Sequence, residues 1–290
     1  MVAATKNMFT QMSAKAGIKN FGEEAIAAMF TEFKQLNDGA MPGSPVFGSV
    51  ESNLLSIKEK RSTLEAVNLI KKKRCGKIKG RTCADGSKQK SYLKEGENIS
   101  SPTVSTESLI ATLVIDAMEK RDVAIFDVPV AYLHAEMPKD KRVLMKLRGI
   151  FVDIMCSVNS EYLPFVVIEK GEKVLYLRIL QALYGCIGSA LLWYDLYATT
   201  LKDLGFKINS CDRCVANKII NGKQCTLVWY VDDKKLSNVD PKVVDNILDI
   251  LKGYFRDLVI TRGSKHAFLG MNIKICEDKN IEIEMKDHFK

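Results

Sequence analysis

The sequence predicts an α+β fold, because strand patterns and helix patterns share the chain without strict β-α-β alternation. The chain has 290 residues, 47% of them hydrophobic, which is enough for a sizeable core and more than one subdomain. Two apolar, strand-like runs end in acids. The first ends at Asp127, and the second ends at the neighbouring Asp232 and Asp233.

The N-terminal part begins with a helix. Residues 22–36 place apolar side chains on one helical face and glutamates elsewhere. The Gly- and Pro-rich residues 37–49 then break the helix. A second helix is predicted over 56–69, with a basic segment after it. Residues 81–103 have no periodic apolar pattern and are predicted to form a long surface loop.

Helical periodicity returns in three later segments, at residues 107–119, 189–204 and 241–255. In the last of these, five residues are predicted to face inward: Val244, Ile247, Leu248, Leu251 and Tyr254.

Strand-forming side chains dominate the segments between these helices. Short strands are predicted at 123–128, 143–147 and 174–177, and a hairpin is predicted over 225–238. Residues 267–285 are expected to form paired strands, with a turn at Asp278, Lys279 and Asn280.

The formal charge of +8 is unevenly placed. Seven cations occupy eleven positions without an acid between them: Lys71, Lys72, Lys73, Arg74, Lys77, Lys79 and Arg81. Such a run is usually a solvated surface. Here Gly, Cys and Ile interrupt it, which favours a strand or turn with its cations on one side. Phosphate is the natural partner of such a surface.

No stretch approaches the roughly 20 apolar residues that span a bilayer, and the N-terminus lacks the apolar core of a signal peptide. A soluble intracellular protein without a membrane partner is therefore expected. The eight cysteines are spread along the chain, which favours reduced thiols. Cys211 and Cys214 have metal-knuckle spacing, but no second Cys/His pair follows at zinc-site distance.

The neighbouring acids Asp232 and Asp233 have two explanations. Asp favours turns, because its side chain bonds its own backbone. However, two like charges about 4 Å apart repel by about 4 kcal/mol at an effective dielectric near 20, and a divalent cation would reverse the sign. With Asp127 ending another strand, we expect the three carboxylates to converge at one end of a shared sheet and hold metal ions.

Five segments carry a resemblance to one family. The residues Tyr230-Val231-Asp232-Asp233 resemble the YVDD box of retroelement reverse transcriptases. Segments of copia-type LTR retrotransposon reverse transcriptases are similar to "KIKGRTCADGSKQ" (77–89), "FDVPVAYLHAEM" (126–137), "ALYGCIGSALLWY" (182–194) and "FLGMNI" (268–273). The similarity runs from about residue 20 to the end, in the order and spacing of the family.

The resemblance implies a right-hand polymerase fold, whose palm is an antiparallel sheet with packed helices. Residues 20–120 would form N-terminal helices and fingers. Residues 121–290 would form the palm with an interleaved fingers segment, truncated before the thumb, which is expected to be absent. Residues 1–19 would be an N-terminal extension.

The resemblance also assigns site residues. Asp127, Asp232 and Asp233 match the catalytic, metal-binding acids. Five residues match positions near the nucleotide: Lys79, Arg81, Tyr132, Tyr184 and Gly185. Lys79 and Arg81 would meet the triphosphate. Tyr132 would lie under the sugar, where its bulk excludes a 2′-hydroxyl. The alternative for Tyr132 is a buried core aromatic.

The implied function is RNA-directed DNA polymerisation by nucleotidyl transfer with two Mg²⁺ or Mn²⁺ ions. The expected partners are a primed RNA or DNA template, deoxynucleoside triphosphates and other domains of a retroelement polyprotein. The expected compartment is the cytoplasm, in a virus-like particle, or the nucleus.

The sequence also departs from the family. Ile187, Ala190 and Leu191 stand where the family has Lys, Pro and Arg, so two cations beside the nucleotide are lost. A rival hypothesis is therefore a catalytically inactive, nucleic-acid-binding remnant of a retroelement. A more distant one is an unrelated Mg²⁺-dependent phosphotransferase.

Overall fold

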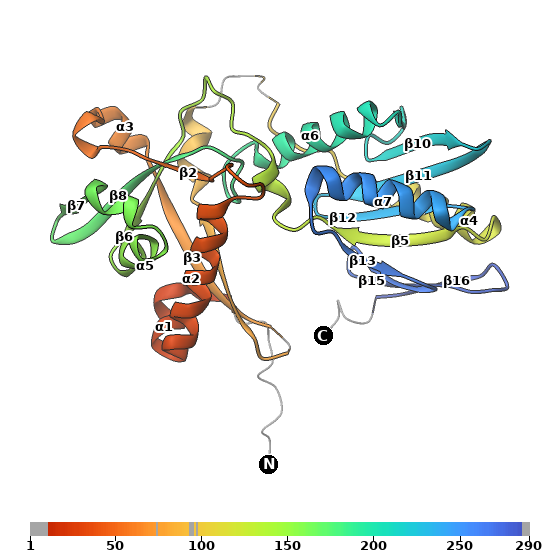
Figure 1. Cartoon of the computed structure of the whole chain (residues 1–290), viewed down its shortest axis with the longest axis horizontal. Helices are drawn as coiled ribbons and strands as arrows, with labels where there is room; N and C mark the ends of the chain where they lie inside the picture. The colour runs from red at the N-terminus through yellow and green to blue at the C-terminus, as the bar shows by residue number, and fades with distance from the viewer. Residues whose placement is uncertain (1–10, 74, 93–95, 97, 286–290) are drawn as a thin grey trace, which may run out of the picture. The chain divides into compact units, whose positions relative to one another are not determined.

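The structure is a computed structural model that describes residues 11–73, 75–92, 96 and 98–285. The chain divides into two compact units (Figure 1). Unit 1 contains Met1–Ile99 and Tyr132–Ser189, and unit 2 contains Ser100–Ala131 and Ala190–Lys290. Helices and strands mix in both units, which confirms the predicted α+β class.

Unit 1 is built on a seven-stranded sheet of order β1-β3-β6-β8-β2, with β4 paired to β3 and β7 paired to β8. Only the β3–β6 pair is parallel among these pairings of the described residues. The strands are β1 (Gln11–Ser13), β2 (Phe47–Ser49), β3 (Leu64–Lys72), β4 (Ile78–Ala84), β6 (Leu144–Arg148), β7 (Val166–Glu169) and β8 (Glu172–Ile179).

The helices of unit 1 are α1 (Ala14–Phe21), α2 (Glu23–Asp38), α3 (Ile57–Ser62) and α5 (Ile150–Val158). Short 3₁₀ turns lie at η1 (Ser52–Leu54), η2 (Gly86–Tyr92), η3 (Ala131–His134) and η4 (Ser160–Phe165). Helix α2 buries the apolar face that its sequence predicts, and Phe33 on this face meets Phe151 of α5 edge-to-face at 6.5 Å. Helix α2 therefore buries against unit 1 the apolar face that its periodicity predicts.

Unit 2 is built on a six-stranded sheet of order β13-β5-β12-β11-β10-β9, in which every listed neighbour pair of described strands is antiparallel. A separate three-stranded sheet has the order β14-β15-β16. The strands are β5 (Asp122–Asp127), β9 (Lys207–Ile208), β10 (Val215–Ile220), β11 (Lys223–Tyr230), β12 (Asp233–Asn238), β13 (Val259–Arg262), β14 (Lys265–Phe268), β15 (Met271–Ile275) and β16 (Ile281–Glu284).

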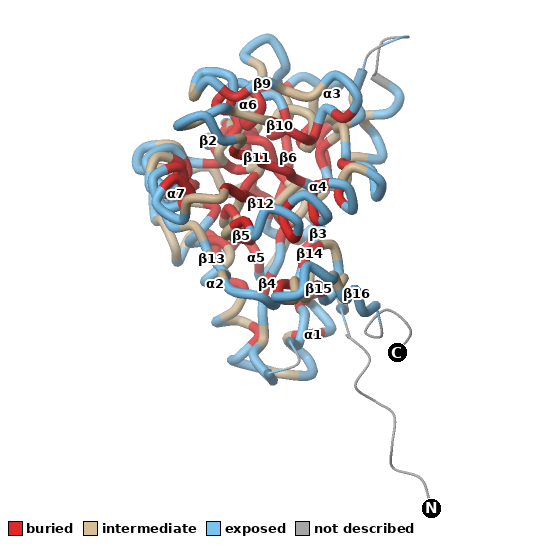
Figure 2. Tube along the Cα trace, turned by 90° about the vertical axis from the view of Figure 1, so that its right-hand side faces the viewer, coloured by how far each residue is buried: buried red, intermediate tan, exposed pale blue. Residues whose placement is uncertain are grey.

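Three helices belong to unit 2: α4 (Thr106–Met118), α6 (Ser189–Asp203) and α7 (Pro241–Phe255). Helix α7 begins where the sequence signals it, because Pro241 occupies the first turn and the Asp240 carboxylate accepts from the N–H of Lys242. The strands β5, β11 and β12 form the buried centre of the unit, shown in red in Figure 2. None of the described helices is both long and apolar enough to cross a membrane.

The predicted helix over 56–69 is wrong in its second half. Ser56 and Glu59 form a reciprocal capping box that starts α3, but the helix ends at Ser62. From Leu64 the chain is strand β3, which pairs with β1, β4 and β6. This pairing with distant segments outweighs the local helical pattern.

The predicted loop over 81–103 is also wrong at its start, since residues 81–84 belong to β4 and residues 86–92 form η2. Residues 93–95 and 97 lie outside the described part of the chain, as do Arg74 of the basic run and residues 1–10 of the predicted N-terminal extension. Several elements were not predicted: helices α1 and α5, and strands β1, β2, β7, β9, β10 and β13.

In α7, the prediction that Tyr254 faces inward is wrong. Tyr254 is 48% exposed, whereas its neighbour Phe255 is buried. Phe255 packs against Trp193 and Tyr197 of α6, with ring centroids 5.4 and 5.6 Å away. In the last turn of α7, Phe255 and not Tyr254 therefore faces the core.

Candidate active site

The three acids singled out in the sequence lie at one end of the six-stranded sheet. Asp127 is the last residue of β5, and Asp233, the first residue of β12, stands directly opposite it in the antiparallel register. Directly opposed residues in such a pair have Cα atoms roughly 4.5–5.5 Å apart. Asp232 lies in the two-residue turn that joins β11 to β12. The structure therefore brings residues from two distant segments to one sheet end.

The backbone around these acids is strained. Val231, at the first position of the two-residue turn, has φ +48°, where hairpins favour Gly and β-branched residues are rare. Val130, three residues after Asp127, has φ +52°, and Leu269 has φ +51°. The Leu269 N–H donates to the carboxylate of Asp233. Left-handed conformations of this kind cost about 1–3 kcal/mol each and cluster at functional sites.

Two side chains hold the strained turn in place. The Trp193 indole Nε1 donates to the carbonyl of Val231 at 2.9 Å. The Lys234 ammonium donates to the carbonyls of Val231 and Asp232 at 3.1 and 2.7 Å. Lys234 is completely buried, with its Nζ 5.0 and 5.2 Å from the ring centroids of Trp193 and Tyr197. The turn that carries Asp232 is thus pinned from helix α6 and from β12.

Burial and like charge dominate the electrostatics here. Burial, followed by the charge of Asp127, raises the pKa of Asp233, while Lys234 and the Leu269 N–H oppose the rise. Burial lowers the pKa of Lys234 to about 8, although Asp232, Asp127 and Asp233 all favour its charged form. One buried ammonium therefore offsets part of the negative charge of three carboxylates.

The acidic end of the sheet suits a divalent cation whose coordination other groups complete. Among the described residues, no three His, Cys, Asp or Glu side chains form a group that could hold a metal ion. Asp127 and Asp233 nevertheless face one another, and their repulsion is the kind that a divalent cation relieves. Mg²⁺ is commonly held by one or two carboxylates plus substrate phosphates and water. The residues present fit such a site.

In unit 1, three of the predicted nucleotide-binding residues meet in a stack. The guanidinium carbon of Arg81 lies 4.8 Å from the ring centroid of Tyr184. The Tyr184 ring in turn lies 4.5 Å from the ring of Tyr132, centroid to centroid. Lys79 and Arg81 alternate with buried residues on β4, so both cations are exposed on one face of the strand. Tyr132 is half-buried, not enclosed in the core.

The loop with Tyr184 and Gly185 is fixed against the end of β4. Ala84 donates its N–H to the carbonyl of Tyr184 at 2.8 Å. Gly185 has φ +87°, and a Cβ there would lie only 2.0 Å from the carbonyl oxygen of Ala84. Farther along, the Ile187 N–H donates to the side chain of Gln89 at 2.8 Å. Only glycine fits at 185, because the two backbones touch.

The acids therefore lie in unit 2, and the five nucleotide-binding candidates lie in unit 1. Sequence reasoning missed Lys234, Trp193 and Gln89. A lysine directly after two acids was a visible signal for Lys234. No local signal pointed to Trp193 or Gln89, because their partners are distant in the chain.

The zinc hypothesis finds little chemical support at Cys211 and Cys214. Cys211 is exposed, whereas Cys214 is buried. Burial raises the pKa of the Cys214 thiol to about 12, so the metal-free thiol stays protonated.

Comparison with known proteins gives one family. Residues 58–289 match the model of a family described as "Reverse transcriptase (RNA-dependent DNA polymerase)". Proteins of this kind generally use divalent metals.

Three solved structures are similar to the chain. A telomerase from Candida tropicalis, truncated from its C-terminal domain, has 12% identity, a TM-score of 0.45 and a match over 89% of this chain. A telomerase from Candida albicans, in complex with a fragment of telomeric RNA, has 11% identity, a TM-score of 0.43 and 82% coverage. A foamy viral protease-reverse transcriptase bound to double-stranded DNA has 11% identity, a TM-score of 0.39 and 99% coverage. The matches span 59%, 49% and 50% of the lengths of those chains.

Proposed function

Because the chain belongs to the reverse transcriptase (RNA-dependent DNA polymerase) family, we propose that it is the fingers-palm part of a copia-type retroelement polymerase. Its reaction is extension of a primer on an RNA or DNA template by deoxynucleoside triphosphates. The observation that carries the proposal is the register of Asp127 against Asp233 at the sheet end, with Asp232 in the adjoining strained turn.

In this proposal the acids act as metal ligands. Asp127 and Asp232 hold two Mg²⁺ or Mn²⁺ ions, and Asp233 supports them as a weaker ligand. Bound divalent ions supply electrostatic stabilisation of the phosphoryl oxygens. The half-buried position of Asp233 opposite Asp127 supports this assignment, because burial and then the charge of Asp127 raise the pKa of Asp233. Trp193 and Lys234 keep the turn in the geometry that presents Asp232.

The nucleotide is bound by residues of unit 1. Lys79 and Arg81 neutralise the β- and γ-phosphates through charge-assisted bonds. The stack on Tyr184 orients the Arg81 guanidinium. Tyr132, whose ring contacts Tyr184, lies under the sugar and disfavours a 2′-hydroxyl, and Gly185 lets the backbone approach the nucleotide and template.

The same proposal assigns the two units. Unit 2, with the acids, acts as the palm, and unit 1 acts as the fingers, including the interleaved segment 132–189. The partners are a primed template and other domains of a retroelement polyprotein. The protein works in cytoplasmic virus-like particles or in the nucleus.

Primer extension tests the proposal. Purified protein is incubated with a primed RNA template, deoxynucleoside triphosphates and Mg²⁺ or Mn²⁺. We expect extended primers from the unmodified chain. The extension rate should fall at least about 100-fold in Asp127→Asn and Asp232→Asn, because each substitution removes a carboxylate that would bind the ions stabilising the charge of the transition state. Asp257→Asn, at an exposed position of the same unit, is the matched control. Products that persist in both site variants would refute the assignment.

One observation favours a second candidate, a nucleic-acid-binding protein without polymerase activity. Ile187 and Leu191 replace two cations of the family's pattern, and the Ile187 N–H donates to the side chain of Gln89. Tight template binding without any extension in Mg²⁺ or Mn²⁺ would favour this candidate.

A further inference from the structure

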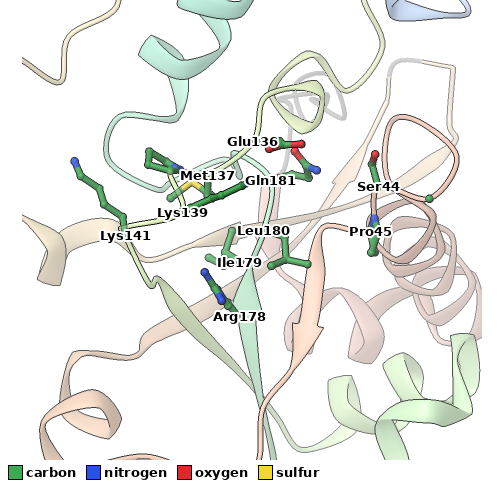
Figure 3. A pocket seen from close by; sticks show the side chains of 12 residues that line it. Ser44, Pro45, Glu136, Met137, Lys139, Lys141, Arg178, Ile179, Leu180 and Gln181 are labelled. Atoms are coloured by element: carbon green, nitrogen blue, oxygen red, sulfur yellow. The ribbon is translucent and has the colours of Figure 1, made fainter.

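Unit 1 contains a cavity that lies outside the residues assigned above (Figure 3). Its volume is about 260 Å³. Three chain segments line it: residues 43–45 before β2, residues 136–139 with 141 between η3 and β6, and residues 178–181 at the end of β8. The volume is somewhat below the roughly 300–1,000 Å³ typical of drug-sized ligands, so the cavity suits a small polar group.

Backbone hydrogen bonds tie the three walls together. The N–H of Leu180 donates to the carbonyl of Val46 at 2.8 Å, and the N–H of Met137 donates to the carbonyl of Leu180 at 2.9 Å. Glu136 and Gln181 form a β-bridge, next to a bond of 2.7 Å from the N–H of Ala182 to the carbonyl of Ala135. The walls are therefore held in place before any ligand arrives, which reduces the entropy cost of binding.

The lining has an excess of positive charge. Lys139, Lys141 and Arg178 line the cavity with one acid, Glu136. Three cations against one carboxylate favour an anionic ligand, and phosphate is the anion that Arg and Lys bind with charge-assisted hydrogen bonds.

A buried acceptor adds a second requirement. Gln181 is only 7% exposed, and its Oε1 has no hydrogen-bond partner among the described residues. In Figure 3 its side chain lies next to the carboxylate of Glu136, a second acceptor. Buried polar atoms are normally satisfied by protein groups, water or a ligand, so this cavity favours a ligand that donates a hydrogen bond and also carries negative charge.

We propose that this cavity binds a ribose-phosphate group of an RNA strand. The phosphate meets the cations that line the cavity, and the 2′-hydroxyl donates to the Oε1 of Gln181. DNA offers the same phosphate but lacks the 2′-hydroxyl, which is the group that lets a protein distinguish RNA from DNA. The inference rests on the proposed function for its choice of a nucleic-acid strand, and it adds a site that binds an RNA strand more tightly than a DNA strand.

Binding of matched oligonucleotides tests the proposal. Fluorescence anisotropy of the full chain is measured without metal or nucleotides, with labelled oligouridylate, oligodeoxyuridylate and 2′-O-methyl oligouridylate of equal length. Gln181→Met removes the acceptor at similar volume. We expect it to weaken oligouridylate binding about 3- to 10-fold, the size of one lost hydrogen bond, and to change oligodeoxyuridylate binding less than about twofold.

The other variants separate charge from hydroxyl recognition. Arg178→Ala should weaken binding of both strands and lower the salt slope by about 0.7, as for one phosphate contact to a single strand. Lys58→Ala removes an exposed cation of α3 outside the cavity and should leave both affinities within about twofold. With the unmodified chain, 2′-O-methyl oligouridylate should bind like the deoxy strand, which tests the hydroxyl donor without any change in the protein.

The proposal is overturned if the 2′-O-methyl strand binds as tightly as oligouridylate, or if Gln181→Met lowers both affinities equally or neither. Uridine monophosphate is then added as a competitor of labelled oligouridylate. If it displaces the labelled strand only at millimolar concentration, the cavity binds the ribose-phosphate of a strand. If it competes as strongly as unlabelled oligouridylate, the cavity binds a free ribonucleotide and the proposal of a strand is wrong. Asp232→Asn should keep the RNA preference. If the unmodified chain does not extend primers but keeps this RNA preference, the polymerase proposal alone is refuted. If the unmodified chain extends primers and Gln181→Met has no effect on binding, the cavity proposal alone is refuted.

Discussion

Two neighbouring lysines, Lys234 and Lys235, are both completely buried and point to opposite faces of the unit 2 sheet. Lys234 is held by turn carbonyls and aromatic rings. Lys235 forms an ion pair with Asp116 of α4. Burying a charge is costly unless it is paired and hydrogen-bonded, so each lysine depends on partners that β12 alone does not provide.

The Lys235–Asp116 pair gives the first prediction. Asp116→Asn leaves the buried ammonium without its counter-ion, and we expect a loss of about 3–5 kcal/mol in the free energy of unfolding. Urea denaturation measures it. The double variant Asp116→Asn/Lys235→Met should recover a large part of the loss, because the unpaired ammonium of Lys235 is removed, while the buried Arg121, which also lies 3.9 Å from Asp116, keeps its ion pair with Glu119. Glu282→Gln, which breaks the exposed pair with Lys274, should have little effect. A double variant as unstable as the sum of the two single variants would contradict the argument.

His266 gives a prediction about pH. The side chain is buried in β14, and burial, helped by the nearby Lys235, lowers its pKa from the ordinary value near 6.5. The unfolded chain therefore takes up a proton below about pH 6.5 before the folded state does. Stability is full above that pH and falls as the pH drops toward the lower folded pKa, by at most about 1.4 kcal/mol per pH unit for this group.

The measurement is urea denaturation between pH 5 and 8, for the unmodified chain and for His266→Phe. The variant should show a shallower fall in stability on the acid side. Parallel profiles would mean that other groups cause the acid sensitivity.

At the scale of elements, hairpins and their connecting loops carry most of the candidate site residues. The β11–β12 turn carries Asp232, the β3–β4 hairpin carries the basic segment, and the loop after β8 carries Tyr184 and Gly185. Each loop is fixed by contacts with another element, such as the bond from Ala84 to Tyr184. Such contacts give the loops the rigidity that positioned site residues require.

Two glycines of one loop make a matched test of that rigidity. Gly185 and Gly188 both have positive φ, but an added Cβ at 185 would strike the carbonyl of Ala84, whereas at 188 it would meet open space. We expect Gly188→Ala to cost about 1 kcal/mol, from the left-handed backbone alone. Gly185→Ala should cost more and should also weaken nucleotide binding. Urea denaturation and nucleotide titration measure the two effects, and equal losses in both variants would exclude the backbone contact as the cause.

The basic hairpin gives a further test at this scale. Arg81 is stacked on Tyr184, whereas Lys72 lies near the ring of Phe21, at 5.8 Å from its centroid. Replacing Lys79 and Arg81 together by Ala should therefore weaken deoxynucleoside triphosphate binding by about tenfold or more, since charge-assisted hydrogen bonds to the phosphates are lost. Replacing Lys72 and Lys73 removes the same charge and is the control, with a smaller expected effect. Equal losses would indicate only a diffuse positive surface.

At the scale of the whole molecule, stability and function oppose one another at the acidic sheet end. Burial and, after it, the charge of Asp127 raise the pKa of Asp233, so its ionised form weakens folding at any pH above the ordinary value of about 3.9. Active sites commonly keep such unfavourable charges, because the ligand needs them. A bound divalent cation would remove the cost.

This trade-off predicts opposite effects with and without metal. In EDTA, Asp233→Asn should raise the melting temperature above that of the unmodified chain. Adding Mg²⁺ or Mn²⁺ should raise the melting temperature of the unmodified chain, since a ligand of the folded state stabilises it, and should raise that of Asp233→Asn less. Asp257→Asn should respond to the metal like the unmodified chain. Thermal denaturation checks both effects, and an unchanged metal response in Asp233→Asn would exclude Asp233 as a ligand.

The amino-acid sequence by itself determined the features of this protein that depend on neighbouring residues. Helical periodicity identified α2, α4, α6 and α7. Strand patterns that end in acids, together with the motif order, pointed to Asp127, Asp232 and Asp233. These signals are short-range, because periodicity and capping act within a few turns of the chain.

Only the tertiary structure decided the features that depend on distant partners. Residues 64–72 became a strand through pairing with β1, β4 and β6, and the register alone set Asp127 opposite Asp233. Lys235 found its counter-ion 119 positions away, and Phe255 replaced Tyr254 in the core against α6. The physical reason is that a strand and a buried charge are both stabilised by partners far apart in the chain. These interactions form only when the sheet and helices assemble.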